Sequence, residues 1–151
     1  MPASFQHEGF VRLFRNRPVL AAELLRDVLG VELPPFTEAR IESADLTDIE
    51  PAKRYADLVI LLVDGRPVRG IVAEVQLDID LDELFSWPVY VANLRARVRC
   101  DVDLLIVTSA PHVARWAARE ISLGHGARLR PLVLGPDGFP LITDAVVRSA
   151  A

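Results

Sequence analysis

Two apolar runs joined by a short turn decide the fold of this chain: Tyr55-Ala-Asp-Leu-Val-Ile-Leu-Leu-Val63 and Val68-Arg-Gly-Ile-Val-Ala-Glu-Val-Gln76. The segment between them, Asp64-Gly-Arg-Pro67, contains the Asp-Gly pair that is typical of a β-hairpin turn. Each run is rich in Val, Ile and Leu and has the length of a buried strand. The two runs therefore predict an antiparallel hairpin in the core of a sheet.

The turn also predicts which residues of the hairpin face one another. If Val63 pairs with Val68, Asp57 lies directly opposite Glu74, and cross-strand partners have Cβ atoms roughly 5 Å apart. Gln76 then points to the same face, because side chains alternate along a strand. We therefore expect two carboxylates and an amide to converge at the end of an apolar hairpin. Their burial is costly unless a cation or hydrogen bonds compensate for it.

The segments around the hairpin predict an α/β fold with a mixed sheet between helices. Apolar spacing and turn residues place the other elements as helices over 5–14, 18–29, from the acidic segment 78–82 to about 99, and 111–120, and as strands over 37–47, 102–108 and 130–134. We expect the strand over 102–108 to return parallel to the hairpin after its helix. The segment 122–128 is interpreted as a loop.

Length and composition limit the class of protein. The 151 residues are 51% hydrophobic, which suits one domain over 1–151, and the net charge of −4 argues against a strongly basic nucleic-acid binder. The single cysteine, Cys100, excludes an intrachain disulfide and is interpreted as a small buried residue. No signal region is recognisable and no apolar run approaches the ~18 residues of a membrane span, so we expect a cytoplasmic protein without membrane contact.

The two acids suit a magnesium site. Mg²⁺ prefers oxygen ligands and keeps several waters, so Asp57, Glu74 and a backbone carbonyl such as that of Val75 would suffice. Such an ion polarises a phosphodiester and activates an attacking water. Gln76 could orient that water or contact a phosphate, but an amide cannot act as a general base or supply positive charge.

This pattern resembles the PD-(D/E)XK nuclease superfamily through Ala56-Asp57 and Glu74-Val75-Gln76. The Glu-x-Gln form is most similar to the Rpn branch, the recombination-promoting nucleases that are also described as transposase-like. The sequence of the hairpin and the segment Phe85-Ser-Trp-Pro-Val-Tyr90 are also similar to those of a group of actinobacterial proteins. The resemblance covers about residues 18–108.

The resemblance implies a restriction-endonuclease-like αβββαβ core and metal-dependent hydrolysis of phosphodiester bonds, with DNA as the substrate and Mg²⁺ or Mn²⁺ as the cofactor. It assigns the functional positions to Asp57, Glu74 and Gln76, and the metal ligands to the two acids. The family also often uses an acid from the first helix. Glu23 is the candidate for that role here, with Asp27 next.

Gln76 stands where the family usually has lysine, and the only lysine, Lys53, is out of register with Glu74. Three alternatives follow: slow catalysis through the glutamine, replacement of the lysine by an arginine such as Arg69 or Arg95, or a catalytically inactive module that binds nucleic acid or protein. In a fourth, purely structural interpretation, Asp57 ends its strand and Glu74 pairs with an arginine.

Other polar and aromatic residues are interpreted as structural. Two arginine clusters suit solvated helix surfaces better than phosphate contacts, Trp87 suits the core with Tyr90 at its edge, and the three histidines suit the surface because they lack zinc spacing. These clusters and histidines are Arg12, Arg15 and Arg17, then Arg95, Arg97 and Arg99, then His7, His112 and His125. A homodimer is left open.

Overall fold

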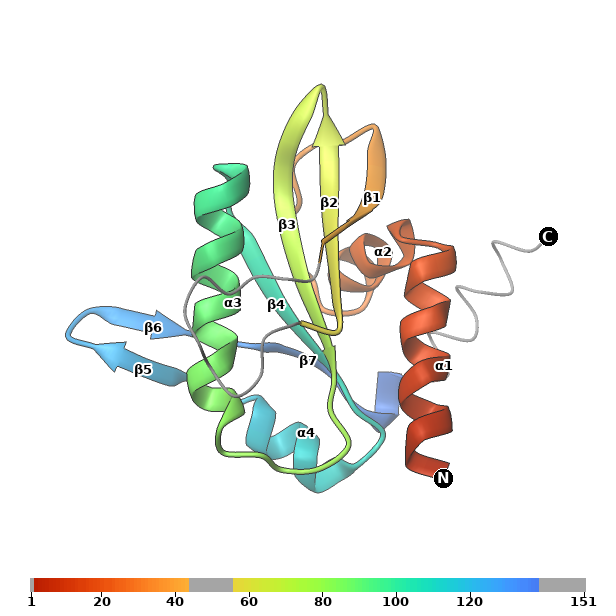
Figure 1. The fold of residues 1–151 in the computed structure, drawn as a ribbon, viewed down its shortest axis with the longest axis vertical. Helices are drawn as coiled ribbons and strands as arrows, with labels where there is room; N and C mark the ends of the chain where they lie inside the picture. The colour runs from red at the N-terminus through yellow and green to blue at the C-terminus, as the bar shows by residue number, and fades with distance from the viewer. Residues whose placement is uncertain (1, 44–55, 139–151) are drawn as a thin grey trace.

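The computed structural model describes residues 2–43 and 56–138, with side chains from residue 7 onward. Its centre is a mixed five-stranded sheet in the order β1-β2-β3-β4-β7 (Figure 1). A separate two-stranded ribbon, β5-β6, lies outside this sheet. The strands are β1 (Glu38–Glu42), β2 (Leu58–Asp64), β3 (Arg66–Val75), β4 (Val102–Val107), β5 (Ile121–Gly124), β6 (Ala127–Leu129) and β7 (Leu132–Leu134).

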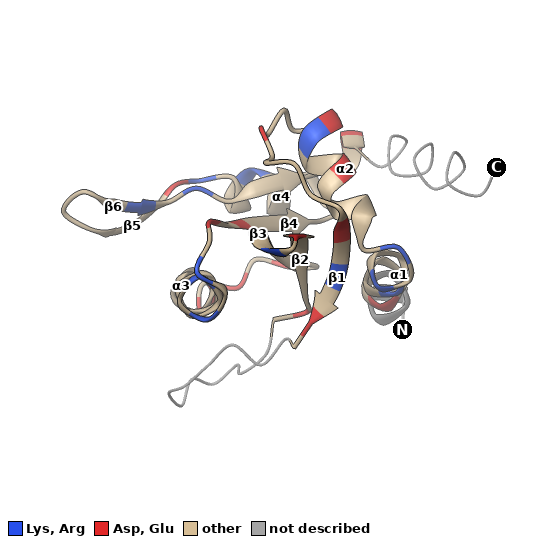
Figure 2. Ribbon diagram, turned by 90° about the horizontal axis from the view of Figure 1, so that it is seen from above, with Lys and Arg blue, Asp and Glu red and all other residues tan. Residues whose placement is uncertain are grey.

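The sheet separates two hydrophobic cores, and Figure 2 shows α1 and α3 on opposite sides of it. One core joins α1 and α2 to alternate residues of β2, such as Ile60, and the other joins α3 and α4 to the residues between them, such as Leu61. No described helix combines the length and apolar character that crossing a membrane requires. The helices are α1 (Pro2–Asn16), α2 (Val19–Asp27), α3 (Glu83–Val98) and α4 (Pro111–Ala117), followed by a 3₁₀ turn, η1 (Pro136–Gly138).

The expected register of the hairpin is confirmed over most of its length. Leu58 pairs with Ala73, and the same register continues as far as Leu62. The turn itself differs, because Val63 pairs with Pro67 and not with Val68. The chain reverses around Gly65, whose φ of 71° suits glycine, and a bulge absorbs the one extra residue on β3. The bulge lies at the turn and leaves the register at the Asp57 end unchanged.

The predicted crossover is also confirmed, since β4 pairs with β3 in parallel after α3. Gly70 allows this close packing: a Cβ there would lie 3.0 Å from Leu94 of α3 and 3.1 Å from Val102 of β4. The order of helix, three strands, helix and strand is that of the expected nuclease-like core. The predicted first strand is present as β1, and its expected residues 44–47 lie outside the described part.

Two expectations are wrong. Residues 122–128, interpreted as a loop, belong to the β5-β6 ribbon, whose side chains are nearly all exposed. An exposed ribbon has no buried face to impose an apolar alternation, so its sequence resembles a loop. Tyr90, expected at the edge of the core, is completely buried beside Trp87 in the core under α3.

Candidate functional site

Asp57 and Glu74 meet where the β2-β3 hairpin ends. Asp57 occupies the bend before β2, and Glu74 is the last residue but one of β3. The backbone N–H of Asp57 donates a hydrogen bond of 2.7 Å to Oε2 of Glu74. In return, the N–H of Val75 donates a hydrogen bond of 2.9 Å to Oδ2 of Asp57. Since the amide and carboxylate of one aspartate are a few bonds apart, the two carboxylates lie within about 7 Å of each other.

The two acids differ in their exposure to solvent. Glu74 is fully buried, whereas the Asp57 side chain is 15% exposed. A buried carboxylate is costly to hold unless hydrogen bonds or a positive charge compensate for its lost hydration. The backbone donors described above supply part of that compensation, because hydrogen bonds to an ionised acceptor are among the stronger ones.

His7 is a site residue that sequence reasoning missed. Its Nε2 atom lies 3.1 Å from Oδ2 of Asp57, which brings α1 to the end of the hairpin. The available signal was helical spacing: His7 shares one side of α1 with Phe10 and Phe14, of which Phe14 is buried in the core. That side of the helix had to face the sheet, so His7 had to approach it as well.

Val75, the last residue of β3, and Gln76, which follows it, come directly after Glu74 in the chain. The Gln76 backbone N–H donates to the Val107 carbonyl, so this residue extends the pairing of β3 with β4. The Gln76 side chain is largely buried, and its amide nitrogen donates a 2.9 Å hydrogen bond to the carbonyl of Asp78. The amide oxygen is thus the group that could accept a hydrogen bond from water. The Val75 N–H binds Asp57, and the role of the Val75 carbonyl as a ligand stays a prediction.

Glu23 does not join the acids. It lies on α2, and its carboxylate is engaged by Arg17, with 3.0 Å between Arg17 Nη2 and Glu23 Oε2. This pair raises the pKa of the Arg17 guanidinium, chiefly through the hydrogen bond. Asp27, the other candidate, pairs with Arg26 at the surface. The N-terminal helices instead bring His7 into contact with Asp57, and Glu8 of α1 lines the same cavity as Asp57.

Neither arginine considered as a lysine substitute approaches Glu74. Arg69 is five positions before Glu74 on β3, so the two side chains point to opposite faces of the sheet. The Arg69 guanidinium instead binds Asp103 of β4 at 2.8 Å. Arg95 is exposed in the last turn of α3, where a cation favours the negative end of the helix dipole.

The donor atoms at the site fit Mg²⁺ better than a structural zinc ion. Within the described residues, no group of three or more His, Cys, Asp and Glu side chains is arranged to hold a metal ion. This excludes from those residues the closed set of four side chains that is typical of structural zinc. Two carboxylates, a backbone carbonyl and water match the oxygen ligands of Mg²⁺, which keeps part of its hydration shell.

Asp57 also opens onto a surface cavity of about 350 Å³ beside α1. His7, Arg12 and Arg15 contribute to its wall, together with Glu8 and Val11. Both arginines are exposed. Two arginines against the single glutamate leave net positive charge from α1 next to the acid that faces solvent.

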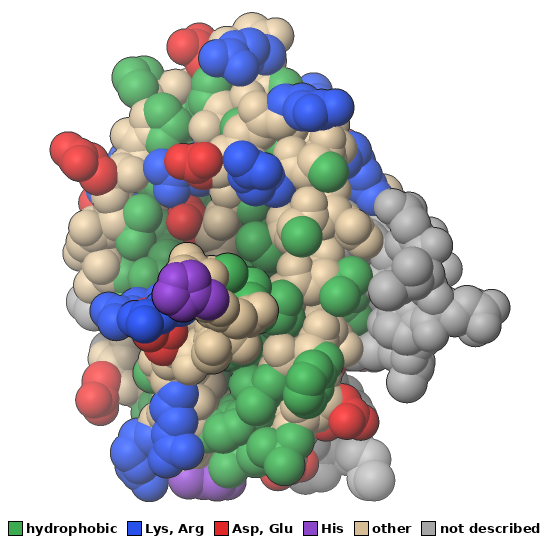
Figure 3. All heavy atoms as spheres, turned by 90° about the vertical axis from the view of Figure 1, so that its left-hand side faces the viewer, with side chains coloured by type: hydrophobic (Ala, Val, Ile, Leu, Met, Phe, Trp, Pro, Cys, Tyr) green, Lys and Arg blue, Asp and Glu red, His purple; other side chains and the backbone are tan. Residues whose placement is uncertain are grey.

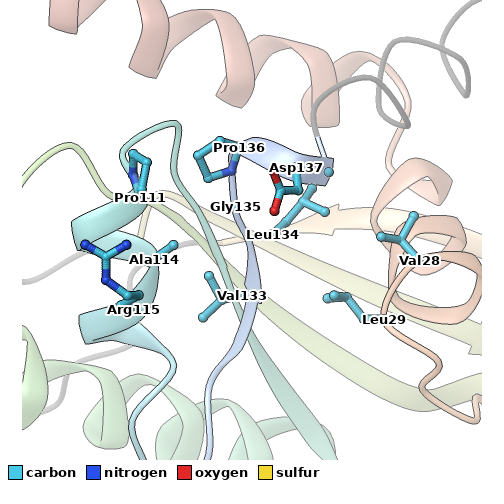
Figure 4. A pocket seen from close by; sticks show the side chains of 11 residues that line it. Val28, Leu29, Pro111, Ala114, Arg115, Val133, Leu134, Gly135, Pro136 and Asp137 are labelled. Carbon is cyan, nitrogen blue, oxygen red and sulfur yellow. The ribbon is translucent and has the colours of Figure 1, made fainter.

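A second cavity, of about 500 Å³, lies away from this site between α2, α4 and β7 (Figure 4). Its wall is mainly apolar, with Arg115 and Asp137 as the charged residues. Neither Asp57 nor Glu74 lines it. This second cavity is therefore separate from the candidate site. Comparison of the chain with family models, with curated proteins and with solved structures gave no match.

Proposed function

We propose that this protein hydrolyses phosphodiester bonds, with DNA as the substrate and with Mg²⁺ or Mn²⁺ held by Asp57 and Glu74. The observation that carries the proposal is the reciprocal hydrogen bonding that joins these two acids at the end of the hairpin. The resemblance to PD-(D/E)XK nucleases supports it, because that family holds its metal at the same strand positions. The test is nicking of supercoiled plasmid by the purified protein in Mg²⁺ or Mn²⁺, with EDTA as the control.

The residues around the acids have separate tasks in this proposal. When bound, the ion would polarise the phosphodiester and activate the attacking water. Val75 offers its carbonyl as a further ligand, and His7 holds the Asp57 carboxylate in place from α1. Gln76, fixed through its amide nitrogen, accepts a hydrogen bond from the attacking water with its oxygen. Since an amide carries no positive charge, we expect slower turnover than with lysine at this position.

In this proposal Arg12 and Arg15, which the sequence favoured as part of a solvated helix surface, contact the phosphates of a nucleic acid. The support is that both line the cavity onto which Asp57 opens. We expect the double variant Arg12→Gln/Arg15→Gln to bind a DNA duplex about tenfold more weakly. The slope of log affinity against log salt concentration should fall by about 1–2. Fluorescence anisotropy in EDTA measures both quantities without cleavage.

The matched control for this binding experiment is Arg66→Gln/Arg95→Gln, which removes the same charge at two exposed positions that do not line the cavity. Binding that falls equally in both double variants would show a general effect of net charge. That result would remove α1 from the proposed DNA surface.

A second candidate function is a catalytically inactive module that keeps the nuclease fold to bind nucleic acid or protein. The observation that favours it is that the hydrogen bonds of Asp57 and Glu74 also fasten the end of the hairpin, a structural task that needs no metal. The glutamine at position 76, where the family usually has lysine, also favours the inactive module.

Thermal unfolding in metal separates the two candidate functions. For a nuclease site we expect Mn²⁺ or Mg²⁺, at about tenfold above its dissociation constant, to raise Tm by about 3 °C or more. The shift should disappear in Asp57→Asn and persist in Glu38→Gln, which removes an exposed carboxylate of β1. An equal shift in all three proteins would assign metal binding to other carboxylates, and no shift in any of them would favour the inactive module.

A further inference from the structure

A third cavity, of about 630 Å³, lies between the start of α3 and the start of the β5-β6 ribbon, and we name it the α3–β5 groove. Leu81, Leu84, Phe85 and Pro88 form one wall. The opposite wall runs from Trp116 through residues 119–123. The groove is separate from the candidate metal site, because none of the acids or arginines proposed for that site lines it.

The rim of the groove exposes large apolar side chains. Phe85 is 78% exposed, Leu81 64% and Leu123 49%, and these are three of the four large hydrophobic residues exposed in the described chain. Figure 3 shows hydrophobic side chains gathered on the lower part of this face, with charged side chains around them. Exposed apolar side chains that gather around a hollow and are rimmed by charges mark an interaction surface.

The β5-β6 ribbon is joined to the core mainly at its base, through Ile121 and Leu129. It projects from the body of the protein (Figure 1) and pairs with no strand of the main sheet. Only Ile121 of β5 is buried, and the other residues of the two strands are exposed or half-buried. An isolated two-stranded ribbon is marginally stable in water. A partner that covers Leu123 and the neighbouring ribbon would therefore stabilise it.

Charged residues that lie beside the two walls of the groove differ in sign, and we name the walls acidic and basic after them. Asp80 and Asp82 flank Leu81 on the α3 side. On the ribbon side, Arg128 and Arg130 both approach Glu120, at 3.4 and 3.5 Å, and remain 67% and 74% exposed. One carboxylate shared by two arginines leaves net positive charge beside that wall, to which Arg119 of the wall itself adds. A surface with an acidic wall and a basic wall complements its own copy when the two are related by a two-fold axis.

From this self-complementarity we propose that the α3–β5 groove is the interface of a symmetric homodimer. The ribbon of each copy lies against the acidic wall of the other, and Phe85 and Leu123 of both copies become buried together. Each charged contact occurs twice because of the two-fold symmetry. This arrangement covers the exposed apolar side chains and supports the projecting ribbon in one step.

Sedimentation velocity of the full chain over a wide range of concentration tests the proposal. We expect a dimer for the wild type and a monomer for Phe85→Asp/Leu123→Asp; both positions are exposed, so the fold should survive, and circular dichroism checks it. Arg95→Glu, a charge reversal at an exposed position that does not line the groove, should leave the dimer intact. A wild type that stays monomeric, or a dimer that persists in the Phe85/Leu123 variant, would overturn the proposal.

A charge exchange tests the pairing of the walls. Arg128→Glu/Arg130→Glu makes both walls of one variant acidic, and Asp80→Arg/Asp82→Arg makes both walls of the other basic, so each should be monomeric alone. Mixed together, they restore opposite charges at both contacts of a two-fold dimer, and we expect a heterodimer. Failure of the two folded variants to associate when mixed contradicts the proposed arrangement. An interface with a different protein would produce no association in any of these samples.

Discussion

Asp57→Asn and Glu74→Gln should each lower metal-dependent DNA cleavage by about a hundredfold to a thousandfold, the usual effect of removing one group that stabilises charge in a transition state. Both changes keep an oxygen that can accept the backbone hydrogen bond now made by the carboxylate. The fold should therefore survive while the negative charge that we propose holds the metal is lost. Nicking of supercoiled plasmid measures the rate, and thermal unfolding checks that each variant is folded.

Glu23→Gln provides the matched control for these variants. Family resemblance assigns Glu23 to the site, yet the structure engages its carboxylate with Arg17 on α2. We therefore expect cleavage close to the wild-type rate in Glu23→Gln. Equal loss in all three variants would return Glu23 to the catalytic site, and unchanged cleavage in all three would indicate a contaminating nuclease. Absence of cleavage by the wild type would favour the inactive module.

Much of the fold could be predicted because its signals are local. The apolar runs around Asp64-Gly-Arg-Pro67 contain both strands and the turn, so the hairpin register followed from one short stretch. The parallel return of β4 followed from the helix between it and β3. The bulge did not follow, because it depends on how tightly the chain turns around Gly65.

The candidate site could be predicted only where one hairpin builds it. Asp57 and Glu74 meet because the β2-β3 register brings them together. His7 reaches Asp57 through the packing of α1 against the sheet. Helical spacing indicated which side of α1 faces the sheet, but not which residue His7 would meet 50 positions away. Glu23 was assigned by resemblance alone, and on α2 it pairs with Arg17 and not with the acids of the hairpin. The positions of His7 and Glu23 therefore depend on long-range packing, which the sequence of the hairpin does not contain.

The second large expected effect is a loss of folding stability when the ion pair between Arg69 and Asp103 is broken. The two side chains are 16% and 18% exposed, and their contact is 2.8 Å. Arg69 also reaches the carbonyl of Glu32 at 3.4 Å, while its Nε atom is buried without a hydrogen-bond partner in the described residues. Arg69→Leu would leave Asp103 largely buried without its cation. We expect a loss of about 2–4 kcal/mol in the free energy of unfolding, measured by urea denaturation.

Two further variants distinguish this interaction from general effects of substitution. Arg66→Leu removes an exposed arginine of the same strand and should change the free energy of unfolding by less than about 0.5 kcal/mol. Arg69→Leu/Asp103→Leu removes both charges and should recover most of the lost stability, because the uncompensated buried carboxylate is gone. A double variant as unstable as Arg69→Leu would show that packing of the arginine, and not the ion pair, carries the effect.

The pH dependence of Arg69→Leu follows from the pKa of Asp103. Burial raises that pKa above its ordinary value of 3.8, and Arg69 opposes the rise through its charge and its hydrogen bond. A raised pKa in the folded state contributes stability that is present below 3.8 and is lost as pH rises through the folded pKa.

Without Arg69 the pKa of Asp103 rises further, so the variant loses more stability on the way to neutral pH. Its deficit relative to the wild type should be largest at neutral pH and smallest below 3.8, where Asp103 is protonated in both proteins. A deficit that is the same at both pH values would show that the charge of Asp103 contributes nothing to it.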